Sequence, residues 1–115
     1  VFSRRFRINY AVENGDETMF DLLRGSGAAV ESVVTIGEEN LLHWFCSNKD
    51  NDDQTSLLEK LIESGCDINA TNWEQRTPLF SAVKNEMVKT CRRLIDGRAY
   101  LDLIDAKGYR PIDVA

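Results

Sequence analysis

The sequence predicts an all-α protein, a solenoid of repeated helical hairpins, and two observations support this fold class. First, residues 65–99 recur after a shift of 33 positions. Residues of matching type then coincide: Cys66 with Ala99, Asn69 with Asp102, Asn72 with Asp105, Pro78 with Pro111, Leu79 with Ile112 and Ala82 with Ala115. Second, apolar residues within the repeated stretch follow helical spacing. A short period of this kind is typical of stacked repeat proteins.

The best-defined repeat contains signals for two helices. Thr77 followed by Pro78 is a hydroxyl N-cap before a proline at the first helical position, so a helix begins at Pro78. Polar residues 84–86 interrupt it, and residues 96–98 end the second helix. The apolar faces of the two helices are formed by Leu79, Ala82 and Val83, and by Val88, Cys91, Leu94 and Ile95.

This order of signals resembles the ankyrin repeat, whose 33-residue pattern has a β-turn, a T-P-L-H-type helix start and a second helix. The resemblance implies a stack of L-shaped units. Hairpin-like finger loops and first helices would form a concave face, with the second helices behind them. About three full units and a truncated one are expected, at residues 1–27, 28–65, 66–98 and 99–115, in a single repeat domain.

In the first unit, residues 14–16 (Asn-Gly-Asp) are predicted to turn between two helices, with Gly15 at positive φ. Arg4, Arg5 and Arg7 make this end basic. We interpret them as a solvated helix end rather than a phosphate or membrane-surface patch.

The second unit spans 38 residues, five more than the 33-residue period, and four of the extra residues fall between its helices, near residues 47–54. A solenoid tolerates an insertion there because the loop ends stay adjacent. The aspartates suggest a calcium loop, but the Gly at the sharp turn and the final Glu of an EF-hand are missing. A mobile acidic loop is therefore expected, with a contact loop as the alternative.

The same unit carries Asn40 as an N-cap and His43, the single histidine of the chain. At this position of the resembled pattern the histidine is a structural clamp that bonds to the neighbouring finger backbone. Phe45 occupies the small-residue position held elsewhere by Ala11 and Ala82. We expect this bulky ring to be displaced or to push the two helices apart.

Composition limits the possible functions of the 115-residue chain. It is 43% hydrophobic and 29% charged, with a net charge of −5, which disfavours nucleic acid as a partner. No apolar run is long enough to span a membrane, and no secretory signal is recognisable. The three cysteines form no paired pattern, so reduced thiols used for packing are expected. An intracellular, cytoplasmic or possibly nuclear protein follows.

Catalytic and ligand-binding motifs are also missing. The sequence contains no phosphate-binding loop, metal-ligand pattern or nucleophile with a base, so we predict a non-enzyme without cofactor, metal or small-molecule substrate.

The sequence departs from the family pattern where that pattern prefers glycine. Gln75 stands where the next unit keeps Gly108, and Glu86 and Arg98 stand at helix ends. Each is predicted to adopt a left-handed conformation that costs a non-glycine residue about 1 kcal/mol.

Function must depend on the exposed residues of the fingers and inner helices, because the repeat itself is a scaffold. Trp73 is the most informative, since a finger tip has little core to fill; it either anchors a partner or packs between units. The full candidate partner-binding set is Trp73, Glu74, Arg76, Tyr109, Lys107, Ile36, Glu39, Lys84 and Asn85.

Three functional hypotheses follow from this set. The first is a module that binds a protein or peptide, and the acidic balance favours a basic partner. The second is a regulatory or structural segment that packs within a larger enzyme, channel or ubiquitin-ligase protein. The third is a methyl-lysine reader, which would need two or three converging aromatic rings around Trp73.

Overall fold

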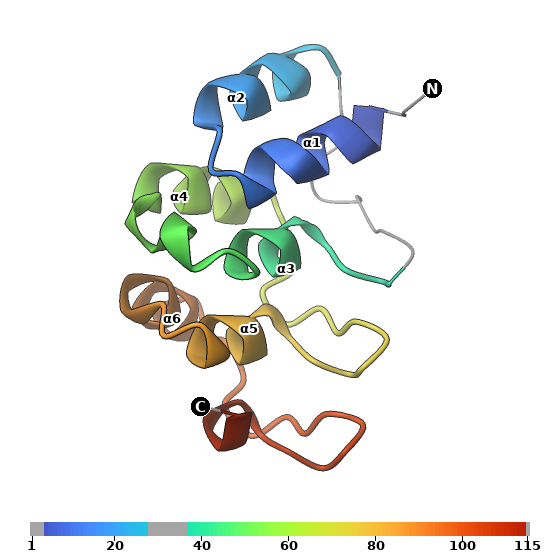
Figure 1. The fold of residues 1–115 in the computed structure, drawn as a ribbon, viewed down its shortest axis with the longest axis vertical. Coiled ribbons are helices and arrows are strands. Elements are labelled where there is room, and N and C mark those ends of the chain that lie inside the picture. The colour runs from blue at the N-terminus through green and yellow to red at the C-terminus, as the bar shows by residue number, and fades with distance from the viewer. Residues whose placement is uncertain (1–3, 28–36, 115) are drawn as a thin grey trace.

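The computed structural model describes residues 4–27 and 37–114, which form a single stack of helical hairpins (Figure 1). The described part contains α-helices and 3-10 helices and no β-strand. Ile36 lies outside the described residues, as do the side chains of Arg4, Arg5 and Arg7. The elements in chain order are α1 (Arg4–Glu13), α2 (Glu17–Gly25), α3 (Leu41–Cys46), η1 (Lys49–Asp53), α4 (Thr55–Glu63), α5 (Pro78–Lys84), α6 (Val88–Asp96) and η2 (Pro111–Val114).

The helices form two layers (Figure 1). The first helices of the units, α1, α3 and α5, lie next to the finger loops, and α4 and α6 lie on the far side. The predicted helical hairpins and the helix starts at Pro78 and Pro111 are confirmed. The fold is therefore the predicted all-α repeat solenoid.

The turn between α1 and α2 has the expected chemistry. Gly15 has a φ of 68°, and the Asp16 side chain caps α2 by accepting a hydrogen bond from the Met19 N–H at 3.0 Å. The third unit differs, because the Thr77 hydroxyl makes no capping hydrogen bond. Thr77 is the N-cap residue of α5, as predicted, but its Oγ1 is buried without a partner among the described residues, so the hydrogen bond expected from its hydroxyl is not formed.

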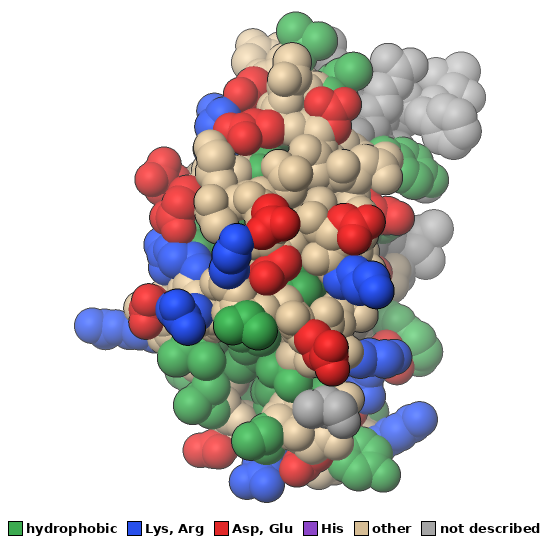
Figure 2. All heavy atoms as spheres, turned by 60° about the vertical axis from the view of Figure 1, so that its left-hand side comes forward, with side chains coloured by type: hydrophobic (Ala, Val, Ile, Leu, Met, Phe, Trp, Pro, Cys, Tyr) green, Lys and Arg blue, Asp and Glu red, His purple; other side chains and the backbone are tan. Residues whose placement is uncertain are grey.

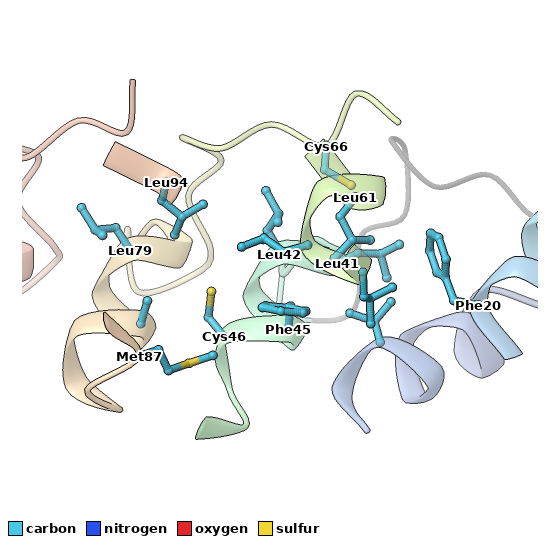
Figure 3. Packing of buried hydrophobic residues seen from close by; sticks show 14 of the residues in the cluster. Phe20, Leu41, Leu42, Phe45, Cys46, Leu61, Cys66, Leu79, Met87 and Leu94 are labelled. Atoms are coloured by element: carbon cyan, nitrogen blue, oxygen red, sulfur yellow. The ribbon is translucent and has the colours of Figure 1, made fainter. Parts of the chain in front are cut away.

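One continuous apolar core runs along the stack (Figure 3). Phe20 of α2 lies at one end, and Leu79 and Leu94 lie at the other. Between them the two helices of the second unit contribute several fully buried side chains, Leu41, Leu42, Phe45, Cys46, Leu57 and Leu61. Each unit thus completes its core against its neighbours, as expected for a solenoid.

Successive fingers are joined by equivalent backbone hydrogen bonds. The Trp73 N–H donates to the Gly37 carbonyl at 3.1 Å, and one unit later the Ala106 N–H donates to the Glu74 carbonyl at 2.9 Å. Because both bonds join the same positions of the repeat, the units remain in register despite the insertion.

The insertion is not the mobile loop that the sequence predicted. Residues 49–53 form the 3-10 helix η1, and Asn51 within it is buried. The reason is that polar side chains of this segment meet main-chain groups of both neighbouring units, which a sequence pattern does not show. The 3-10 helix η1 lies between α3 and α4.

Candidate functional site: the finger surface

Two of the described fingers are held by the same arrangement of hydrogen bonds from backbone N–H groups to one side-chain oxygen. The Asn72 Oδ1 accepts hydrogen bonds from the Glu74 and Arg76 N–H groups at 2.9 and 3.0 Å. In the next unit the Asp105 Oδ1 accepts from the Lys107 and Tyr109 N–H groups at 2.9 and 2.8 Å. Asn and Asp form such local turns readily. Each finger tip is thus held by a buried side chain at its base, and its outer residues project from a defined backbone.

Trp73 both contacts the preceding finger and remains exposed to solvent. The edge of its ring rests on the preceding finger, since a Cβ added to Gly37 would lie 3.2 Å from Trp73 Cδ1. Even so, 68% of the residue is exposed to solvent. Trp73 therefore packs between units through one edge and presents most of its indole to solvent.

Arg76 is largely engaged within the protein. Its Nε donates to the Asp105 Oδ2 at 2.9 Å, and its guanidinium lies over the Phe80 ring at 5.6 Å from the centroid. Burial would raise the pKa of Asp105, but hydrogen bonds from the Tyr109 N–H, the Arg76 side chain and the Lys107 N–H outweigh it and lower that pKa. Arg76 thus joins the third and fourth fingers rather than standing as a free cation.

A small hollow of about 210 Å³ lies between the third and fourth fingers. It brings together four of the predicted site residues, Trp73, Glu74, Arg76 and Lys107, with Asp105 and Ala106. An aromatic wall beside charged groups of both signs can receive a side chain of a partner.

The other predicted residues lie outside this hollow. Tyr109 is 50% exposed and does not line it. Glu39 is half-buried, with its Oε2 3.5 Å from the Asn72 Nδ2. Lys84 is exposed at the end of α5, whereas the Asn85 Nδ2 donates to the Cys46 carbonyl at 2.7 Å. Asn85 therefore has a structural contact between two units.

His43 has the structural role that the resemblance implied, because it bonds to the backbone of the neighbouring finger. Its Nδ1 accepts from the Asn40 N–H at 3.1 Å, so the proton of the neutral ring is on Nε2, which donates to the Arg76 carbonyl at 2.9 Å. The Asn40 Oδ1 in turn accepts from the His43 N–H at 3.1 Å. Burial lowers the pKa of His43 below its ordinary 6.5, against the opposing effects of the Arg76 carbonyl and Glu39.

This burial gives the fold a pH dependence. Well above pH 6.5, His43 is neutral in both the folded and the unfolded chain, and its contribution to stability is complete. As the pH falls through 6.5, the unfolded chain takes up a proton before the folded one, so stability falls until the lower folded pKa is passed. We expect a loss of about 1 kcal/mol between pH 7.5 and 5.5, measured by urea unfolding. Since the chain has one histidine, a His43→Gln variant should show a much smaller difference between the two pH values. An equal pH dependence in both proteins would contradict this assignment.

The cysteines pack rather than react. Burial raises the pKa of the Cys46 thiol far above its usual range, and it also raises that of Cys91. Nucleophilic chemistry needs a lowered thiol pKa. Within the described ranges, no three His, Cys, Asp or Glu side chains are grouped so that they could hold a metal ion.

An apolar surface on the outer side was missed by the sequence analysis. Figure 2 shows hydrophobic side chains gathered over the lower part of this face, below a region of mixed charges. Val83, Val88, Cys91 and Ile95 line a shallow depression here. Of the apolar residues of α6, Leu94 is fully buried while Val88 and Ile95 are exposed.

Together, the stacked helical hairpins and the hydrogen-bonded finger loops that connect them define a helical repeat protein. A family model described as ankyrin repeats (3 copies) matches residues 8–105, so the chain belongs to the ankyrin-repeat family. Ankyrin repeats generally act as protein–protein interaction modules. No helix in the described part of the chain has the length and apolarity needed to cross a bilayer.

Proposed function

We propose that this chain is a non-catalytic module that binds a protein or peptide along its fingers and inner helices. The observation that carries the proposal is Trp73, a large aromatic side chain that is two-thirds exposed yet fixed on the Gly37 backbone. A side chain that is already held in place loses little conformational entropy on binding. Exposed Trp and Tyr are also the side chains that most often dominate binding energies.

The charges around Trp73 favour a basic partner. Arg76 and Asp105 largely neutralise each other, so Glu74 and Lys107 are the remaining charged groups among the described residues that line the hollow. Glu39 adds a further negative charge at the preceding finger. The net charge of −5 adds a long-range attraction for a basic chain. We expect a partner segment that places an aliphatic or basic side chain against the indole.

The test compares partner capture by the wild-type chain with capture by a Trp73→Ala, Tyr109→Ala double variant. Truncating hot-spot aromatics costs about 2 kcal/mol or more, so we expect affinity for a captured partner to fall at least about 30-fold in calorimetry. Tyr100→Ala is the matched control, because Tyr100 is equally exposed and precedes the fourth finger. Circular dichroism must show that all three proteins are folded. Equal affinities for the wild type and the double variant would contradict the proposal.

A second candidate function is packing within a larger protein, and the exposed apolar depression at Val88 and Ile95 supports it. In the same experiment, binding that survives the finger substitutions but is lost in Val88→Lys would favour this alternative. The methyl-lysine hypothesis gains no support. Trp73 is the one aromatic side chain among the described residues that line the finger hollow. Trp44 instead packs edge-to-face on Tyr10, with ring centroids 6.0 Å apart.

A further inference from the structure

We propose that the insertion at residues 47–54 is a clamp that makes the first three units unfold as one cooperative block. In a solenoid, each unit is stabilised by its interfaces with its nearest neighbours, and cooperativity depends on the strength of these interfaces. The clamp strengthens two successive interfaces at once, through the adjacent residues Asn51 and Asp52.

Toward the first unit, the clamp binds the end of α1. The Asn51 Nδ2 lies within hydrogen-bonding distance of the Val12 and Glu13 carbonyls at 3.1 and 3.0 Å, and the Asn48 Nδ2 donates to the Glu13 carbonyl at 2.9 Å. The last four carbonyls of a helix have no partner within the helix. The clamp supplies donors for two of them from a different unit.

The fit against the first unit is close. A Cβ on Gly15 would lie 2.5 Å from the Asn51 Oδ1, so only glycine leaves room for this amide. The Asn51 Nδ2 also lies 3.0 Å from the carbonyl of Phe45, in its own unit. The Val12 carbonyl also accepts from the Gly15 N–H at 3.1 Å, so loss of the buried Asn51 would remove one donor from each of these carbonyls rather than all of their donors.

Toward the third unit, the clamp caps the start of α6. The Asp52 Oδ1 accepts from the Thr90 N–H at 2.8 Å, and its Oδ2 accepts from the Lys89 N–H at 3.3 Å. The N-cap residue of α6 is Met87, whose side chain makes no capping hydrogen bond. The carboxylate also has the sign that the positive end of a helix dipole attracts.

Comparison with α2 shows what is unusual here. Asp16 caps α2 from the residue directly before that helix, so the first unit is self-contained at this point. In contrast, α6 depends on a carboxylate of the preceding unit. The first turn of α6 therefore cannot open without losing a contact to the second unit, and the two units are coupled through main-chain groups.

Native-state hydrogen exchange of the full chain tests this coupling. The readouts are the amides of Leu94 in α6 and Leu61 in α4, which both lie in the fully buried helical core. In the wild type they should exchange through the same global opening. In Asp52→Ala the Leu94 amide should exchange at least about 10-fold faster than the Leu61 amide.

Two further variants complete the design. Asp50→Ala is the matched control, because Asp50 lies in the same 3-10 helix but is exposed. It should leave the two rates equal. Asp52→Asn keeps one acceptor oxygen and should separate the rates less than Asp52→Ala, which keeps the test valid if the alanine variant does not fold. The proposal is overturned if both amides accelerate equally in the Asp52 variants, or if they already differ 10-fold in the wild type.

Discussion

Replacing Phe45 by alanine is expected to destabilise the chain by about 3–5 kcal/mol, although alanine is what the other three units carry at this position. The Phe45 side chain is fully buried in the core beside Leu41 and Leu42 (Figure 3). Truncation would remove the burial of the ring and leave a cavity that the short helix α3 cannot close. Urea unfolding followed by circular dichroism measures the difference.

The measured change in stability shows whether the core accommodates the Phe45 ring or is strained by it. Phe45→Leu, which keeps most of the apolar volume, should cost clearly less than Phe45→Ala. A neutral or stabilising Phe45→Ala would mean that the ring is overpacked and forces the unit open, as the sequence pattern allowed.

The second large effect is expected for His43→Ala. The substitution removes the acceptor for the Asn40 N–H and the donor to the Arg76 carbonyl, and both groups stay buried or partly buried. The Arg76 carbonyl keeps the Asn72 N–H as a donor at 3.0 Å, whereas the Asn40 N–H loses its acceptor. An unsatisfied buried group costs about 1–3 kcal/mol, so we expect a loss of about 2 kcal/mol at pH 7.5 in the same urea assay.

A control and a contrary result follow from the geometry. His43→Gln retains a polar side chain that can satisfy one of the two groups, so its loss should lie between those of the wild type and the alanine variant. A loss below about 1 kcal/mol for His43→Ala would show that water or local relaxation replaces both bonds.

Much of the fold could be predicted because the local signals recur. Gly15, Asn40 and Pro78 mark turns and helix starts through their own backbone chemistry, and these predictions are confirmed. The departures from the family pattern are confirmed as well. Gln75, Glu86 and Arg98 have φ values of 61°, 56° and 71°.

The missed features are those that depend on contacts between units. Glu38 also has a positive φ of 61°, and it precedes Gln75 by the offset that relates Leu42 to Leu79, so the register could have revealed it. The ordered structure of the insertion could not be predicted in this way, because Asn51 and Asp52 bind main-chain atoms that are far away in the sequence. A polar run with distant partners is indistinguishable from a solvated loop.

The candidate site was only partly predictable for the same reason. The sequence placed Trp73 on a finger tip, but the support of its ring by Gly37 depends on the spacing of adjacent fingers. Arg76 and Asn85 have the types of residues that bind partners, yet both make internal contacts with neighbouring units. Whether a polar residue is available to bind a partner therefore depends on its contacts with the neighbouring units.

The helix-capping contacts of Asn51 and Asp52 also limit how this array can be rearranged. Repeat proteins are often treated as strings of exchangeable modules, which can be duplicated, deleted or shuffled. Here the second unit fits a glycine-containing turn of the first unit. On its other side it fits helix α6, whose own N-cap residue makes no side-chain capping hydrogen bond. Moved elsewhere in a repeat array, it would bring a buried amide and a carboxylate to neighbours that do not match them. Its place in the order of units is thus fixed by its own chemistry.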